Sequence, residues 1–245
     1  MSTIPQSAGN SLNLSPLLAA LFPAGVVAVE SREPGDPALL LPAEAAHLGR
    51  AVAKRVQEFA AGRLCVRRAL HEYGIDQFPL RVAADRQPVW PEGFVGSITH
   101  TAGLCAAVVA ESRIIAAVGI DTEIVGHVTP DIWSTICVAS EADWVNSLRP
   151  SERAAAVTLI FSAKEAFYKC QYPLVAEWLD FHDVVIESES WGQRGQNAGP
   201  ILIRATRRLR FEEHALLPIV GRYQFHEEFV SVGFALPQAA NILVK

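Results

Sequence analysis

A long helical pattern followed by several short apolar runs occurs twice in this chain. This repeated order constrains the fold more than any other feature of the sequence. Between residues 42 and 73, apolar residues on one face predict one long helix or two abutting helices, ended by Gly74. Four apolar runs separated by turn residues follow and predict strands: 80–84, 95–99, 104–110 and 114–120. The last two runs are expected to form an antiparallel hairpin that turns at residues 111–113.

The same order returns in the second part of the chain. A helical region is predicted over 131–148, and Pro150 opens another helix that continues to about residue 172. Four further runs predict strands: 184–187, 201–205, 219–225 and 229–236. The repetition predicts two similar halves packed together, residues 1–121 and 122–245, without a residue-level repeat between them.

The charge balance limits which ligands the chain can hold. It has 245 residues, with 21 Lys and Arg against 26 Asp and Glu, and a formal net charge of −5. General nucleic-acid binders usually carry a large basic surplus, so we expect no nucleic-acid partner. Any polyanion bound here must be held by a local cluster of basic residues.

Neither a membrane segment nor a zinc site is expected. The most apolar run among the first 30 residues, 17–29, is cut by Pro23 and Gly25 and is too short to cross a bilayer of ~30 Å. The cysteines at 65, 105, 137 and 170 lack the paired spacing of zinc ligands. They indicate buried thiols in a reducing compartment, so we expect a cytoplasmic protein.

Two acids at the end of a predicted strand form the first candidate site. Asp121 and Glu123 project from the same face of the strand because side chains alternate along it. Two carboxylates so close repel each other unless a cation lies between them, and such oxygen ligands suit Mg²⁺. The alternative interpretation is a pair of solvated acids at a strand end.

The helix after Pro150 carries the second candidate group. Glu165 and Lys169 are four residues apart, the spacing of an exposed helical ion pair, which is the structural alternative. On a face turned toward Asp121, Glu165 could instead bind metal or take a proton, and Lys169 could hold phosphate. Lys164 points about 100° away around the helix, and its role is less defined.

Two further groups could hold phosphate. The segment 96–103 joins small hydroxyl residues and glycines to His100, which could donate to a phosphate oxygen; a lone histidine is more often structural. On the first long helix, Arg55 and Arg63 lie about 12 Å apart along the axis, and their guanidinium groups could converge on one phosphate. A solvated basic face is the alternative for this helix.

Taken together, these motifs resemble the signature of the 4'-phosphopantetheinyl transferase family, in particular its enterobactin-synthase-activating type. A Gly-hydrophobic-Asp-x-Glu strand end stands at 119–123, and a Phe-Ser-x-Lys-Glu-Ala-x-x-Lys helix at 161–169. Segments 53–63, 88–100 and 178–181 are similar to other parts of the family pattern. The resemblance covers about residues 43–187.

The resemblance implies an α+β fold of two pseudo-symmetric halves, each a helix with a small antiparallel sheet, and a coenzyme A cleft between them. The implied reaction transfers the 4'-phosphopantetheine arm of coenzyme A to a serine of an apo carrier protein and releases adenosine 3',5'-bisphosphate. The implied partners are acyl or peptidyl carrier proteins of fatty acid, polyketide or nonribosomal peptide synthesis, siderophore synthesis included. We expect the enzyme to be a monomer.

The same resemblance assigns a role to each candidate residue. Asp121 and Glu123 would bind Mg²⁺, and Glu165 would either complete the metal site or act as the base toward the serine. The remaining candidates would contact coenzyme A, with Lys169 and His100 also catalytic: Arg55, Arg63, Arg86, Thr99, His100, Lys164 and Lys169. Arg86 departs from the family pattern: many relatives have a lysine in this loop, and Arg86 is shifted by one position relative to it.

Two other functions use the same residues. A Mg²⁺-dependent phosphatase or pyrophosphatase would use the same acids, with water in place of the serine. A non-catalytic module that binds coenzyme A or a carrier protein would keep the fold alone, but every predicted catalytic acid and base is present. We therefore favour the transferase.

Overall fold

A computed structural model describes residues 12–49, 51–188, 197–215 and 218–238. Its first half contains β1 (Asn13–Leu14), α1 (Pro16–Ala19), β2 (Val26–Ser31), η1 (Pro37–Leu39), α2 (Pro42–Ala45), α3 (Ala53–His71), β3 (Phe94–Thr101) and β4 (Leu104–Glu111). The second contains β5 (Ile115–Ile124), η2 (Pro130–Ile132), α4 (Trp133–Ile136), α5 (Ala139–Ser147), α6 (Pro150–Val175), η3 (Phe181–Asp183), β6 (Val184–Glu187), β7 (Ala198–Ala205), η4 (Arg210–Glu213), β8 (Ile219–His226) and β9 (Phe229–Pro237).

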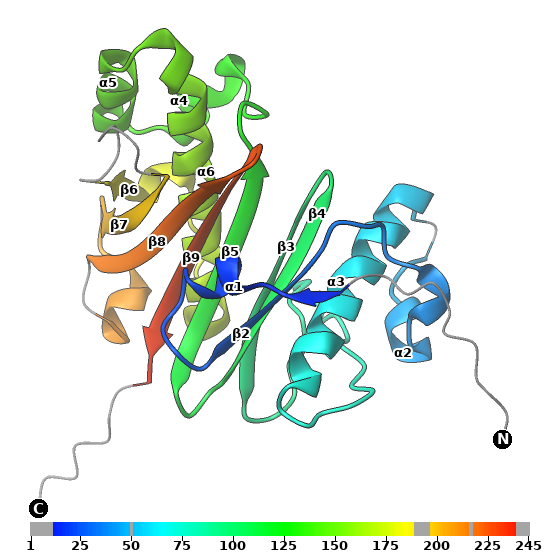
Figure 1. Ribbon diagram of the computed structural model, residues 1–245. Helices are drawn as coiled ribbons and strands as arrows, with labels where there is room; N and C mark the ends of the chain where they lie inside the picture. Colours follow the sequence, from blue (N-terminus) through cyan, green and yellow to red (C-terminus); the bar gives the residue numbers. More distant parts are fainter. Residues whose placement is uncertain (1–11, 50, 189–196, 216–217, 239–245) are drawn as a thin grey trace, which may run out of the picture.

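The strands form two antiparallel sheets, which confirms the α+β prediction. One sheet has the order β1-β2-β4-β3, and the other has the order β5-β9-β8-β7-β6. Helix α3 packs against the first sheet and α6 against β5 and β9 of the second, so each half pairs a long helix with a sheet (Figure 1). The boundary at residue 121 stays a prediction; the whole of β5 pairs with β9.

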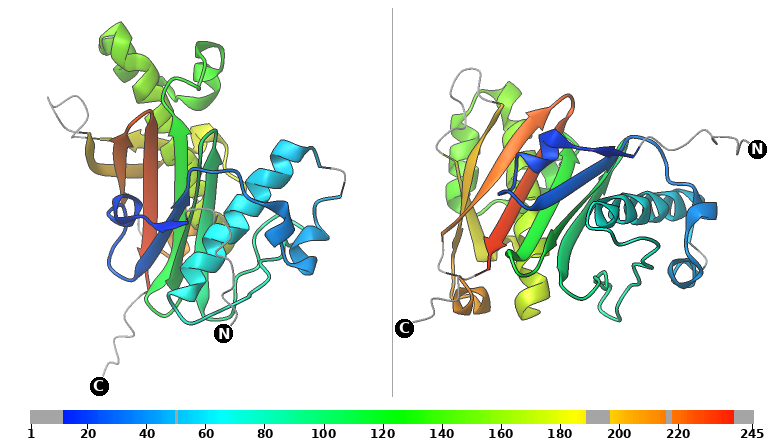
Figure 2. Two further views of the ribbon diagram at one scale, coloured as in Figure 1. Left: turned by 45° about the vertical axis from the view of Figure 1, so that its right-hand side comes forward. Right: turned by 60° about the horizontal axis from the view of Figure 1, so that its bottom comes forward.

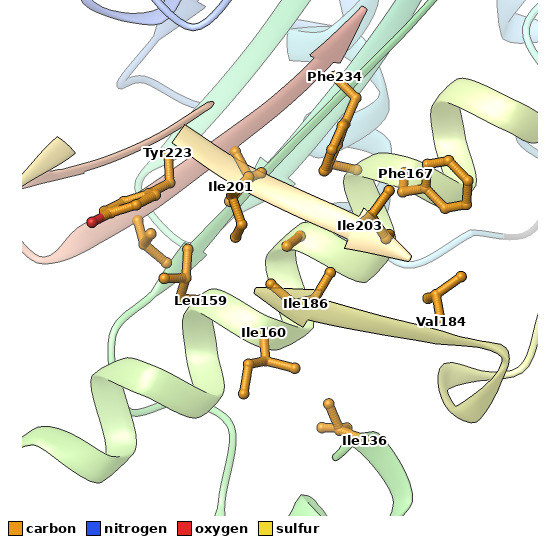
Figure 3. Close-up of a cluster of buried hydrophobic side chains, with 14 of the residues drawn as sticks. Ile136, Leu159, Ile160, Phe167, Val184, Ile186, Ile201, Ile203, Tyr223 and Phe234 are labelled. Atoms are coloured by element: carbon orange, nitrogen blue, oxygen red, sulfur yellow. The ribbon is translucent and has the colours of Figure 1, made fainter. Parts of the chain in front are cut away.

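Three apolar clusters hold these layers together. One lies between α3 and the first sheet, and another lies between α6 and the second sheet. In the latter, Phe167 of α6 meets the rings of Phe211 and Phe234 at 5.2 and 5.9 Å, and aliphatic residues from β6 and β7 surround it (Figure 3). The third cluster joins α1, β2 and β4 to β5 and β9, so the two halves share buried surface. Figure 2 shows α1 and β2 on the side of the molecule where β5 and β9 lie.

Most predicted elements are present, with shifted ends. The expected helix over 42–73 is two helices, α2 and α3, and the region 131–148 is divided into η2, α4 and α5. Helix α6 confirms the prediction from Pro150 and continues to Val175, where Ala176 adopts a left-handed φ of 48°. The four cysteines are buried and free, as expected.

Two local predictions are wrong. The runs 104–110 and 114–120 do not form a hairpin: β4 pairs with β2 and β3, whereas β5 pairs with β9. The hairpin is instead β3–β4, where Gly103 supplies a left-handed φ of 82°. Residues 80–84 form no strand: Val82 makes an isolated bridge to Pro88 within a tight turn, where Ala83 N–H donates to Gln87 O and Val89 N–H donates to Arg81 O. The backbone N–H of Leu80 donates to the side chain of Glu44.

Strand β2 and helix α1 lie in the first 40 residues, for which the sequence predicted no element. The apolar run 17–29 contains the end of α1 and the first part of β2. Among the described residues, none of the helices combines the length and apolar character needed for such a span.

Gly119 sets the distance between β5 and α6. A Cβ at this position would lie 2.0 Å from the carbonyl oxygen of Ala166 and 2.6 Å from the amide nitrogen of Cys170. Real Cβ atoms do not approach backbone atoms so closely, so only glycine lets the strand lie directly against the helix. Asp121, two residues farther along β5, is thereby brought to Lys169 of α6.

We predict that Gly119→Ala destabilises the protein by about 3 kcal/mol or more, because β5 must move away from the rigid backbone of α6. Chemical denaturation measures the free energy of unfolding. Gly62→Ala on α3 is the matched control. The nearest neighbours of a Cβ there are side-chain atoms, Cγ2 of Ile98 at 3.1 Å and Sγ of Cys105 at 3.9 Å, and alanine favours the helix, so a change within ~1 kcal/mol is expected. Equal effects of the two substitutions would contradict the constraint.

Candidate active site

An ion pair between the two signature segments forms the centre of the site. Lys169 Nζ on α6 donates to Asp121 Oδ1 on β5 at 2.7 Å, and the hydroxyl of Thr99 donates to the same oxygen at 3.3 Å. Asp121 is 3% exposed, and its Oδ2 is buried without a hydrogen-bond partner in the described part of the chain. A buried carboxylate oxygen normally has a partner, so Oδ2 is available for a ligand.

The other two predicted acids experience the charge of Asp121. Burial raises the pKa of Glu123 to about 7, and the negative charges of Asp121 and Glu165 add to that effect while Lys169 opposes it. Burial also raises the pKa of Glu165, again opposed by Lys169 and reinforced by Asp121. The fold therefore gathers negative charge from β5 and α6 beside one ammonium group.

The donor chemistry of this region fits a divalent cation. Two partly buried carboxyl groups have raised pKa values, and Asp121 Oδ2 lacks a partner. Within the described ranges, however, no three His, Cys, Asp or Glu side chains already stand together as a metal-binding group. The ligand set of Asp121, Glu123 and Glu165 therefore stays a prediction.

His100 at the end of β3 lies among charged residues of α3. Arg55 Nη1 donates to His100 Nε2 at 3.2 Å, and Glu58 Oε2 lies 3.5 Å from the same nitrogen. Burial lowers the pKa of His100, and the charge of Glu58 opposes this effect. Sequence reasoning gave Glu58 no role, although its position three residues after Arg55 on a helix places the two side chains together.

Arg63 is buried deeper in α3 than a solvated basic face would allow. Its side chain lies over the ring of Phe59, with Cζ 3.6 Å from the ring centroid, and the residue is 8% exposed. Nε has no hydrogen-bond partner among the described residues, and burial lowers the pKa to about 10. A buried guanidinium with an unused donor suits an anion, but the predicted contact with a phosphate of coenzyme A stays a prediction.

Arg86 and Lys169 line one hollow of about 300 Å³, where the loop before β3 faces the end of α6. Much of its wall is aromatic: Trp90, Tyr168, Tyr172 and Trp178. Trp178 is 76% exposed, and its ring lies 5.5 Å from that of Tyr168. Local sequence patterns did not indicate the aromatic wall, because its residues come from two distant segments of the chain. The hollow provides an apolar wall beside a cationic end.

Lys164, predicted to contact coenzyme A, is engaged with three groups of the protein instead of facing the hollow. Its ammonium group is buried and donates to Ile136 O at 2.8 Å, to Glu141 Oε2 at 2.7 Å and to Phe181 O at 2.8 Å. These three bonds use all of its donors. Burial lowers the pKa of Lys164 and the nearby Glu141 carboxylate opposes that, so the pair is a structural connection between α6, α4, α5 and η3.

Thr99 was also expected to contact coenzyme A, and in the structure its hydroxyl is bonded within the protein. The residue is 1% exposed. Its hydroxyl accepts from the backbone N–H of Thr122 at 3.0 Å and donates its single proton to Asp121. No donor is left for a phosphate.

Comparison with known proteins gives a consistent picture over most of the chain. Residues 43–110 match the family model for the 4'-phosphopantetheinyl transferase N-terminal domain, and residues 117–224 match that for the 4'-phosphopantetheinyl transferase superfamily. The two matches divide near the turn between β4 and β5. They contain every predicted site residue.

Individual relatives agree with these matches. The chain is 40% identical over 173 residues to the 4'-phosphopantetheinyl transferase Svp of Streptomyces mobaraensis, covering 68% of this chain and 70% of that protein. It is 36% identical over 202 residues to the 4'-phosphopantetheinyl transferase PptT of Mycobacterium tuberculosis, covering 78% and 87%. Enterobactin synthase component D of Salmonella typhimurium is 39% identical over 119 residues, or 47% and 48% of the two chains.

We predict that Lys164→Met destabilises the protein by about 3–5 kcal/mol, because it leaves the buried Glu141 carboxylate without its cation. The loss is measured by denaturant unfolding monitored by tryptophan fluorescence. The same substitution at Lys54, whose side chain is 79% exposed, should change stability by less than ~0.5 kcal/mol. A Lys164→Met protein as stable as the wild type would refute the structural role.

The raised pKa of Glu123 predicts a pH-dependent effect of Glu123→Gln. The unfolded carboxyl ionises near 4.5 and the folded one near 7, so the folded state binds more protons between these values. This group therefore makes the wild type lose stability as pH rises through that window. In metal-free buffer, Glu123→Gln should be more stable than the wild type by about 2 kcal/mol at pH 8, after allowance for partial exposure, and nearly equal to it at pH 4.5.

Denaturation at the two pH values measures this difference. The control is Glu213→Gln, an exposed substitution expected to stay within ~0.5 kcal/mol of the wild type at both. If Glu123→Gln is the less stable protein at pH 8, Glu123 is not held in a repulsive, poorly solvated place.

Proposed function

Because this chain belongs to the 4'-phosphopantetheinyl transferase superfamily, we propose that it moves the 4'-phosphopantetheine arm of coenzyme A to a serine hydroxyl of an apo carrier protein, releasing adenosine 3',5'-bisphosphate. The family is one of enzymes, and the chain is therefore a transferase. The observation that carries the proposal is the meeting of Asp121 with Lys169 beside Glu123 and Glu165. It joins both family signatures in one partly buried site.

The reaction is a phosphoryl transfer, in which catalysis depends mainly on positioning and on neutralising charge on the phosphate oxygens. Lys169 and His100, from opposite halves, are the groups we assign to the pyrophosphate of coenzyme A. Arg55, beside His100, and the unused Nε of Arg63 are assigned to the 3'-phosphate. This local positive charge allows an acidic chain to hold a polyanion.

We assign Mg²⁺ to Asp121, Glu123 and Glu165. The ion, when bound, neutralises negative charge on the pyrophosphate. The raised pKa of Glu165 also suits a base that takes the proton of the carrier serine, so the two roles of this residue stay open.

The hollow lined by Arg86 and Lys169 is the part of the cleft that we assign to coenzyme A. Its aromatic wall suits an apolar, flexible arm, and its cationic residues suit the adjoining phosphates. Binding energy from the contacts with the apolar arm can orient the reacting phosphorus of the pyrophosphate at the cationic end of the hollow. Arg86 reaches this hollow from a left-handed position, with φ of 71°.

The carrier partner, the monomeric state and the cytoplasmic location also remain our predictions. We propose a carrier of fatty acid, polyketide or nonribosomal peptide synthesis, siderophore synthesis included. Four buried, unpaired cysteines support a reducing compartment.

Transfer is tested by incubating the enzyme with coenzyme A, Mg²⁺ and apo carrier proteins and weighing the carriers by mass spectrometry. We expect a gain of one phosphopantetheine arm. Asp121→Ala should lower the rate at least ~100-fold, because it removes a charged group from the centre of the site, while coenzyme A still binds in calorimetry. Asp76→Ala, at an exposed residue that pairs with His71, should retain transfer.

Other outcomes would favour the rival functions. Unmodified carriers together with released phosphate would indicate a phosphatase. Binding of coenzyme A with neither reaction would indicate a binding module. Undiminished transfer by Asp121→Ala would refute the assignment of that residue.

A further inference from the structure

The two sheets meet at β3 and β5, and no backbone ladder joins them there. Each is the last strand of its own sheet, and the two strands run close together (Figure 1). An edge strand leaves a row of backbone N–H groups unpaired, and buried ones need partners. The N–H groups of β5 that point away from β9 must therefore find acceptors on β3.

Hydroxyl groups of β3 supply those acceptors. The N–H of Ile120 donates to Ser97 Oγ at 3.2 Å, and the N–H of Thr122 donates to Thr99 Oγ1 at 3.0 Å. Both donors and both hydroxyl residues are buried. Two side chains thus replace a strand ladder between the halves, and we call this pair of contacts the hydroxyl seam.

Strand β3 contacts β5 with one face and α3 with the other, because its side chains alternate between the two faces. Ser97 and Thr99 face β5, whereas Ile98 lies against Gly62 of α3 and His100 contacts Arg55 of α3. The seam therefore fixes the strand that carries His100 relative to the strand that carries Asp121.

Thr99 has a second contact that Ser97 lacks. Having accepted from Thr122, its hydroxyl directs its only proton to Asp121 Oδ1, which also accepts from Lys169. Oδ1 is thus held by donors from both halves, while Oδ2 has no partner within the described residues. Thr99 is 1% exposed, so this contact is shielded from bulk solvent.

We propose that Thr99 is a positioning residue for the reaction. Its hydroxyl fixes the Asp121 carboxylate to the seam between the halves, so that Oδ2 is the oxygen presented to the ligand. The proposal rests on the proposed transferase function.

Ser231 on β9 provides a matched control. Its hydroxyl contacts Thr122 Oγ1 at 2.8 Å and His226 Nε2 at 3.0 Å. Thr99 and Ser231 are thus both buried hydroxyls bonded to Thr122, but only Thr99 also contacts Asp121. Loss of either hydroxyl removes a similar structural contact.

The experiment compares Thr99→Val, Thr99→Ser and Ser231→Ala with the wild type in the transfer assay. Thr99→Val should lower kcat ~10-fold with KM for coenzyme A changed less than ~2-fold, because alignment and not ground-state binding is lost. Thr99→Ser, which keeps the hydroxyl, should restore most of kcat, and Ser231→Ala should retain it. Denaturation confirms that each variant is folded under assay conditions; if Thr99→Val is not, Thr99→Ala takes its place.

Hydrogen exchange supplies a readout that needs neither metal nor activity. The amide of Thr122 should exchange faster in Thr99→Val, which removes its acceptor, and not in Ser231→Ala. Unchanged exchange would overturn the seam. Faster exchange with unchanged kcat, or an equal loss of kcat in Ser231→Ala, would overturn the positioning role. A wild type without transfer would defeat the proposed function instead, and the exchange comparison would still decide the seam.

Discussion

The close contact of β5 with α6 at Gly119 determines the rest of the site. A side chain there would overlap backbone atoms of the helix, so the strand and the helix meet without an intervening layer. Asp121 of the strand then lies 2.7 Å from the ammonium group of Lys169 on the helix. Lys169 is therefore paired with Asp121 and is not the partner of Glu165 in a solvent-exposed helical ion pair. The close packing at Gly119 thus places the charges of Asp121 and Lys169 together, and charges this close in a partly buried place interact strongly.

The acids illustrate how a fold can hold groups that oppose its own stability. Glu123 and Glu165 are partly removed from water beside Asp121, and the cost is visible in their raised pKa values. A single ammonium group compensates only part of this charge. Such an arrangement is typical of sites that bind a cation or a proton during function, since a purely structural surface would separate the like charges.

The sequence predicted the chemistry better than the connections. Asp121, Glu123, Glu165 and Lys169 could be found because strand alternation and helical spacing are local properties, and the structure brings their charges together. The partner of β5 could not be found, because β9 lies more than 100 residues later and the turn after β4 looks like an ordinary hairpin. The partners of Thr99 and Lys164 could not be found for a related reason: they come from other elements that are distant in the sequence.

Glu141 has an effect beyond its contact with Lys164. Its other oxygen accepts the N–H of Ile186 at 2.7 Å, and Ile186 belongs to β6, the outermost strand of the five-stranded sheet. An open sheet margin can recruit a strand from another molecule and begin aggregation. The Glu141 carboxylate occupies one backbone N–H of this edge strand, which makes the strand a poorer template for pairing with another molecule. The residue that holds Lys164 of α6 thus also opposes association between chains.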